Sequence, residues 1–190
     1  MRKLIILAFI VIAKITFAQN KDTIGLQTPF ANGEVAYQKT FKAPGKSITL
    51  LFNNSRSWFE KRYDNLDSIK MQNSAAGHLS GIGWEVLTFK GPLGMDVPSR
   101  AGMTIAIMSK DDSYSVHISR IILGYEEEPG KPRTYFTAED LMNHVLGKKY
   151  PKGTIDPVPF NKKRSKKALE SLNALVGGMM TSISQTMGGK

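Results

Sequence analysis

The chain has 190 residues, a formal net charge of +10 and no cysteine. A chain of this length can bury one hydrophobic core without covalent cross-links. The lack of cysteine excludes disulfides, thiol nucleophiles and thiolate metal sites.

The first eighteen residues have the composition of a secretion signal. Arg2 and Lys3 precede the apolar run Leu4–Ile12, and the tripeptide Thr16–Ala18 has small residues at its two ends. This order predicts signal cleavage near Ala18 and an exported protein, either periplasmic or secreted. The run is shorter than the ~20 apolar residues that span a bilayer. The alternative interpretation is an N-terminal helix at the membrane interface.

The next segments predict a flexible lead-in, a strand and a helix. Residues 19–33 are polar with scattered glycine, proline and asparagine. Apolar alternation from Val35 to Phe41 predicts a strand that ends at residues 43–45. Ser47 is suited to cap a helix, and apolar residues recur at helical spacing up to Tyr63, so an amphipathic helix is expected there with its aromatic side chains in the core.

Consecutive strands joined by short turns are expected up to residue 125, and they are therefore antiparallel. They are predicted at Ile69–Asn73, at His78–Phe89 with Ile82, Trp84 and Val86 on one side, around Met103–Ile107, and from Tyr114 to Tyr125. Gly81 and Gly83 predict a bulge or a bend. Residues 91–100 are predicted to be a loop, and residues 110–113 a hairpin turn.

Residues 126–190 are expected to form a linker, a short helix, a basic segment and a C-terminal amphipathic helix. Thr137 and Asp140 are spaced as in a capping box, and this short helix should end at Gly147. The last helix should begin near Asn161. Its small residues recur every four positions on one face, which would permit close approach to another backbone and a homo-oligomer: Ala174, Gly178 and Ser182.

Residues 34–125 resemble a family of exported bacterial domains of unknown function with a fold like that of the TATA-box-binding protein (TBP). The resemblance rests on several short sequence segments. The first are Val35–Phe41 ending at Pro44–Gly45, then Leu51–Phe52 and Ser57–Phe59. The later ones are Ile69–Gly77 leading into Gly81–Gly83, and Ile105–Ile107 continuing through Lys110–Tyr114 to Val116–Ile118. It implies an α+β fold: a twisted antiparallel sheet of about five strands, with the 47–63 helix on one face and a helical extension beyond. The family supplies no catalytic residues, and its fold does not imply DNA binding.

The residues predict no catalytic site, cofactor or metal. His78, His117 and His144 are not spaced as paired metal ligands. Residues 77–81 only superficially match a nucleophile elbow, because no helix follows them. The acidic pairs at 111–112 and 126–128 lie in a turn and a linker, where carboxylates are expected to be solvated.

The positive charge is concentrated in residues 148–167. This segment holds eight basic residues against Asp156: Lys148, Lys149, Lys152, Lys162, Lys163, Arg164, Lys166 and Lys167. It is interpreted as a contact for an anionic membrane surface, an acidic polysaccharide or an acidic protein, in a non-enzymatic envelope or secreted binding module. Nucleic acid is disfavoured because the basic residues of this segment are not regularly interleaved with aromatic ones. The alternatives are a solvated connector, a hydrolase-like enzyme with a cleft beside residues 91–100, and a homo-oligomer formed through the last helix.

Overall fold

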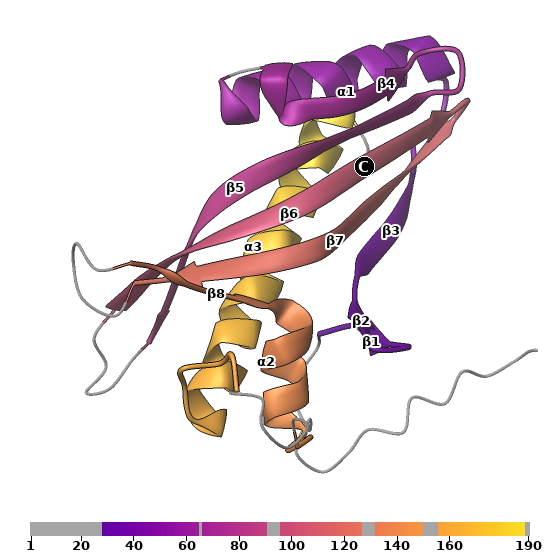
Figure 1. Ribbon diagram of the computed structural model, residues 1–190. Coiled ribbons are helices and arrows are strands. Elements are labelled where there is room, and N and C mark those ends of the chain that lie inside the picture. The colour runs from indigo at the N-terminus through magenta and orange to yellow at the C-terminus, as the bar shows by residue number, and fades with distance from the viewer. Residues whose placement is uncertain (1–27, 65, 91–95, 127–131, 150–155, 189–190) are drawn as a thin grey trace, which may run out of the picture.

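One antiparallel sheet and a layer of helices make up the protein (Figure 1). The computed structural model describes residues 28–64, 66–90, 96–126, 132–149 and 156–188. The helices cover one face of the sheet, and Figure 1 looks onto the other face, with the long C-terminal helix passing behind the strands. This arrangement confirms the predicted α+β class.

Six strands form the main sheet. They are β3 (Tyr37–Lys42), β4 (Ile69–Asn73), β5 (His78–Lys90), β6 (Asp96–Lys110), β7 (Ser113–Tyr125) and β8 (Thr134–Thr137). The order is β3-β7-β6-β5-β4, with β8 also paired to β7, and neighbouring strands are antiparallel. β3 covers residues 113–118 of β7 and β8 covers residues 122–125, so two short strands share one edge of β7.

The first helix is held at its N-terminal end by the β6–β7 turn. α1 (Ile48–Tyr63) is capped by Ser47, as predicted, and the Ile48 backbone N–H also donates to Asp111 Oδ1 at 2.8 Å. Asp112 Oδ1 accepts from the Gly45 N–H at 2.6 Å. Both carboxylates are exposed, as expected for a turn, and they also accept these backbone hydrogen bonds, because a helix N-terminus leaves backbone donors that need acceptors.

A polar cluster ties the C-terminal end of α1 to β5. Arg62 donates to both carboxylate oxygens of Glu85, at 2.9 and 2.8 Å, and the Tyr63 hydroxyl donates to Glu85 at 3.0 Å. Burial, reinforced by the negative charge of Glu85, raises the pKa of the Tyr63 hydroxyl well above its usual value. Glu85 is thus fixed on the covered face, which orients its neighbour Trp84 toward the opposite face.

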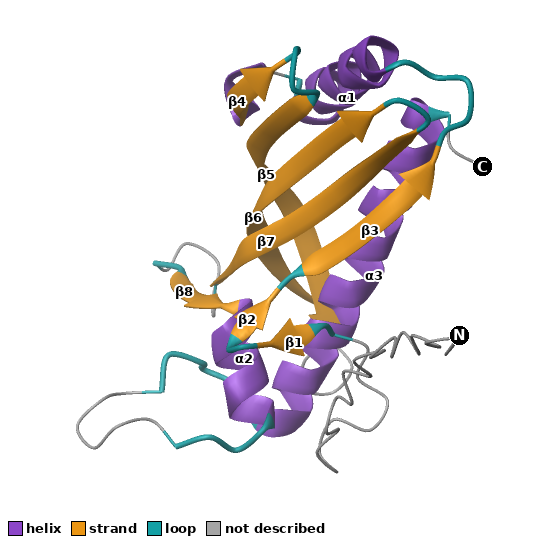
Figure 2. Ribbon diagram, turned by 90° about the vertical axis from the view of Figure 1, so that its right-hand side faces the viewer, coloured by secondary structure: helices purple, strands orange, loops and turns teal. Residues whose placement is uncertain are grey.

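The C-terminal half of the chain belongs to the same core as the sheet. α2 (Ala138–Val145) begins with the predicted capping box, and α3 (Lys162–Met187) runs along the covered face (Figure 2). The Trp58 indole N–H of α1 donates to Ser182 Oγ of α3 at 3.1 Å. The buried side chains of α3 join the main hydrophobic cluster: Ala168, Leu169, Leu172, Val176, Met179, Ile183 and Met187. The boundary expected at residue 125 therefore does not divide the core.

One prediction of local structure is corrected, and two elements are added. Residues 96–100 are not a loop: β6 begins at Asp96 and pairs with the end of β5. Pro98 is accommodated because it lies beyond the part of β6 that pairs with β7, where no hydrogen-bond donor is needed. The sheet has six strands, since β8 adds one to the expected set. A 3-10 turn, η2 (Leu66–Ser68), also precedes β4.

The lead-in is also shorter than predicted. β1 (Phe30–Ala31) and β2 (Glu34–Val35) form a hairpin, so residues 30–33 are not a flexible lead-in. Its turn residues Asn32 and Gly33 both have positive φ, which is the turn type that Asn-Gly favours. The proposed signal, residues 1–18, lies outside the described residues.

Bulges are found in β4 and β7 and not in β5. The register shifts at residue 70 of β4 and at residues 120–121 of β7, where Arg120 has a φ of 53°. Gly81 serves close packing: a Cβ there would lie 2.5 Å from the Ser68 carbonyl oxygen and 2.6 Å from the Phe59 ring.

Candidate binding surface

The uncovered face of the sheet, called here the open face, carries an exposed apolar patch. Among the described residues, every large apolar side chain that is exposed lies on this face except Leu50 of α1. The members of this open-face patch are Met71, Ile82, Trp84, Val86, Met108, Ile122 and Tyr135. Contiguous apolar patches on a soluble domain mark interaction sites, whereas scattered apolar residues do not.

Trp84 lies flat on the sheet in the centre of the patch. A Cβ on Gly102, its partner across the β5–β6 pair, would lie 2.8 to 2.9 Å from three carbons of the indole six-membered ring. Nearly equal distances to three adjacent ring atoms mean that the ring face covers the glycine. The other ring face is exposed, and the side chain is 50% accessible, whereas the second tryptophan, Trp58, is 3% accessible.

Tyr135 makes a related contact on the neighbouring strands, with one edge of its ring nearest the glycine. Its ring lies against Gly124, where a Cβ would approach within 2.8 Å of a ring carbon, and the side chain is 55% accessible. Gly102 and Gly124 are diagonal neighbours across β6 and β7. Two glycines thus let two aromatic rings lie on the backbone and form a flat apolar platform.

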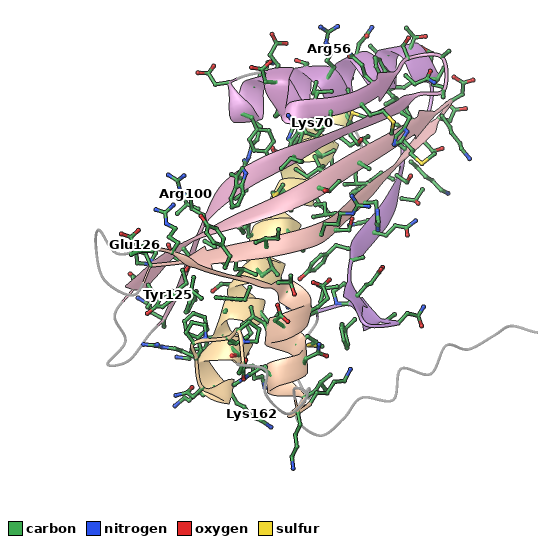
Figure 3. The ribbon with its side chains drawn as sticks, in the orientation of Figure 1. Arg56, Lys70, Arg100, Tyr125, Glu126 and Lys162 are labelled. Atoms are coloured by element: carbon green, nitrogen blue, oxygen red, sulfur yellow. The ribbon has the colours of Figure 1, made fainter. Side chains whose placement is uncertain are left out.

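Arg100 lies at one end of the patch. It is exposed on β6, directly opposite Val86 of β5 on one side and Gly124 of β7 on the other. Figure 3, which views the open face, shows Arg100 on the same part of the sheet as Glu126. Glu126, however, accepts a hydrogen bond from Arg133 at 3.2 Å, and none of the ion pairs among the described residues includes Arg100.

The composition of the open-face patch resembles that of a protein interface. Tryptophan, tyrosine, methionine and arginine are enriched at the centre of such interfaces, while lysine and the acidic residues are depleted. At the end of the face, Lys90 pairs with Asp96 at 2.7 Å. The centre has aliphatic groups beside the rings and lacks the carboxylates and amides with which a polar ligand such as a sugar would be oriented.

A groove of about 500 Å³ adjoins the open-face patch where β3 and β8 leave a gap along β7. Val35 and Ile121 contribute buried side chains to its lining, which also includes His117, Ser119 and Ile122. Among the described residues no hydrogen bond joins His117 to Ser119, and the two side chains are successive outward residues of one strand. The groove therefore extends the open face and does not assemble an acid–base pair from these two residues.

The described basic residues of the 148–167 segment gather at one end of the molecule, where α2 ends and α3 begins. The Lys162 ammonium lies 2.9 Å from the position of a Cβ on Gly147, so residues 148–149 and the start of α3 are neighbours. Lys148 lies over the Phe30 ring at 5.3 Å, and Arg164 lies over the Phe160 ring at 5.6 Å. The structure thus brings the described charges of this segment together; Lys152 is outside the described residues. Lys162, Lys163, Lys166 and Lys167 lie in the first turns of α3.

The one acid of the basic segment has a partner that the sequence did not predict. His144 Nδ1 lies 2.7 Å from Asp156 Oδ2, and the other carboxylate oxygen accepts from the Val158 N–H at 2.9 Å. This contact fastens the middle of the basic segment to the end of α2. Within the described residues no group of three or more metal-ligating side chains converges.

The open-face patch was not predicted as a site. The sequence places Ile82, Trp84 and Val86 on one side of a strand, but the pattern does not tell which side is covered. Leu79, Leu87 and Phe89, on the opposite side, are equally apolar and are buried. The covered side is determined by α3, which packs on it and follows more than seventy residues later in the chain.

Comparison with known structures places this fold among the TBP-like proteins. The crystal structure of a DUF4468 family protein from Bacteroides ovatus aligns with a TM-score of 0.65 and 20% identity, covering 90% of this chain and 98% of that chain. A TBP-like protein from Parabacteroides distasonis aligns with a TM-score of 0.56 and 19% identity, covering 83% and 97%. At these identities the likeness shows the fold alone. No curated protein sequence matches the chain.

Residues 37–122 match the profile of a family described as a domain of unknown function (DUF4468) with TBP-like fold. The matched segment lies within the part of the chain for which the sequence indicated this resemblance, and the match confirms the resemblance. The alignment with the Bacteroides ovatus structure covers more of the chain than this segment, so the structural likeness extends beyond it. No described helix is long and apolar enough to cross a membrane.

Proposed function

We propose that this protein is an exported, non-enzymatic binding module that docks a partner protein on the open face of its sheet. The observation that carries the proposal is the gathering of exposed apolar side chains around two flat aromatic rings on one face. Half-exposed tryptophan and tyrosine side chains lower the solubility of a protein. A partner that covers them removes this disadvantage.

Site-specific photocrosslinking tests the docking surface. A benzophenone amino acid is placed at Val86, which is 71% accessible on the open face, or at Leu50 on α1 as the matched control. Both variants are made in the native host from the full chain. We expect one discrete protein adduct from position 86 and none from position 50. Absence of an adduct at 86, or the same adducts from both positions, would overturn the proposal.

Export is tested separately, by fractionation and intact mass. Cleavage after Ala18 leaves Gln19 as the first residue. The mature protein should be recovered outside the cytoplasm with that mass. A cytoplasmic protein that retains Met1 would contradict export without bearing on the docking surface.

A second binding role is supported by the convergence of the basic residues at one end of the molecule. We propose that Lys148, Lys149 and Lys163, which are exposed, contact an anionic surface. Each basic residue near an anionic membrane contributes about 1 kcal/mol, and salt screens this attraction. Binding to vesicles containing acidic lipid should therefore be strong at low salt and lost at high salt, and changing the three residues to glutamine should weaken it. Binding that is absent or independent of salt would contradict this role.

A further inference from the structure

Arg100 stands out because it is a charge at the end of the open-face patch, in the same row of the sheet as Val86 and Tyr135. Its cross-strand neighbours are Val86 and Gly124, and the Tyr135 ring lies over that glycine. The acids nearest along the strands are engaged elsewhere, Glu126 with Arg133 and Asp96 with Lys90. In the free protein the guanidinium is solvated, so its position costs little.

The cost changes when a partner covers the patch. An apolar surface laid over Trp84 and Tyr135 would remove water from Arg100, and a desolvated charge without a counter-ion costs several kcal/mol. A carboxylate presented by the partner would meet that charge with two parallel hydrogen bonds, which is the geometry that a guanidinium fork favours. The bond would be strengthened by the surrounding rings, which exclude solvent from it.

We infer that the docked protein presents an aspartate or glutamate, within an apolar segment, to Arg100 between the Trp84 and Tyr135 rings. This inference rests on the proposed function and adds the chemistry of the partner to it. Charge complementarity selects an acidic segment. The aliphatic neighbours Ile82, Val86 and Ile122 favour a protein surface over a sugar or a phosphate, neither of which would make use of them.

A displayed library of random twelve-residue peptides serves as the probe. It is selected against the wild-type protein and, in parallel, against Arg100→Glu, Arg100→Gln, Trp84→Ser and the control Leu50→Ser. Arg100 and Trp84 are exposed, so these variants should fold, and their urea midpoints are checked first. We expect wild-type peptides to combine aromatic or aliphatic residues with an acid, and the Arg100→Glu protein to enrich lysine or arginine at that place.

The affinities of one selected peptide complete the test. Arg100→Gln should weaken its binding by at least about 30-fold, as when one partner of a desolvated charge pair is removed, and Leu50→Ser should leave it unchanged. Peptides that need Trp84 but show no acidic preference, or a preference unaltered by Arg100→Glu, would overturn this inference and leave the proposed function standing. Failure to enrich any peptide that depends on Trp84 would count against both.

Discussion

Two glycines of the sheet distinguish the covered face from the open face. A Cβ on Gly81 would meet the Ser68 backbone and the Phe59 ring, neither of which can move, whereas on Gly102 it would meet only the outer part of Trp84. Gly81→Ala should therefore lower the free energy of unfolding by about 2 kcal/mol or more, as overpacking does. Gly102→Ala should cost under about 1 kcal/mol, because the exposed indole can swing away.

Urea unfolding of both variants checks this contrast, and the emission of Trp84 supplies a second readout. In Gly102→Ala the displaced indole should change its emission, while the buried Trp58 contributes a constant background. Equal losses of stability in the two variants would show that the rings do not lie as described.

The carboxylate of Asp111 is a structural acceptor at the start of α1. Asp111→Ala removes a charge-assisted hydrogen bond to the Ile48 N–H and should lower the free energy of unfolding by about 1 kcal/mol. Lys110→Ala, one residue earlier in the same hairpin, is the control and should have a smaller effect. A loss no greater than that of the control would mean that this carboxylate does not stabilise the start of α1.

Single residues were predictable from sequence where the signal is local. Ser47, Thr137 and Asn161 cap their helices as expected because capping depends on a few neighbouring residues. The roles of Trp84 and Arg100 were not predictable. Each depends on which face α3 covers, and that is decided by packing between segments distant in the chain.

At the scale of elements, α3 has one side buried against the sheet and one side exposed to solvent. Gly178 lies on the exposed side, where a Cβ added to it would have no atom within 4 Å. Leu172 lies on the other side and is fully buried. Gly178→Ala should raise the free energy of unfolding by about 0.5 to 1 kcal/mol through helix propensity. Leu172→Ala should lower it by about 2 to 5 kcal/mol through the cavity that it leaves. Thermal unfolding of the two variants measures the increase and the decrease in stability. A destabilising Gly178→Ala would contradict this view of the helix.

The exposed side of α3 provides a test of self-association. Removing residues 161–190 would remove core side chains, so a substitution is the cleaner change. If Ala174, Gly178 and Ser182 formed a helix–helix contact between copies, Gly178→Leu would lower the mass in solution. We predict the same mass for Gly178→Leu and for the wild type by light scattering, because the docking surface proposed here lies on the sheet.

Elements with clear local patterns were predictable, and those without were missed. α1, β4 and the Asp111–Asp112 turn match their predictions because periodicity and turn residues define them. β8 has four residues and pairs only through its register with β7, so no pattern of its own revealed it. The proline in residues 96–100 led to the prediction of a loop. These residues form a strand because the partner strand β5 extends far enough to pair with them.

For the whole molecule, buried tyrosines predict weakness at alkaline pH. Burial raises the pKa of the hydroxyls of Tyr37, Tyr63 and Tyr114 above the ordinary tyrosine value of about 10. The folded state therefore keeps these protons more tightly than the unfolded chain. The resulting stability is complete below about pH 10 and is lost as the pH rises beyond it. The urea midpoint should fall steeply there, and less steeply in Tyr37→Phe; a flat profile would contradict the burial of these hydroxyls.

The open face remains uncovered by any described part of the chain, and its coverage by a partner protein is the claim on which the proposed function depends. Oxidative footprinting compares the purified protein with the protein in its native host. Trp84, Met71 and Met108 report on the open face, buried Trp58 serves as the unreactive reference, and Leu50 reports on the exposed helix. We predict that the three open-face residues are protected in the host relative to the purified protein, while Leu50 reacts equally in both. Equal oxidation of Trp84 in the two settings would contradict the claim.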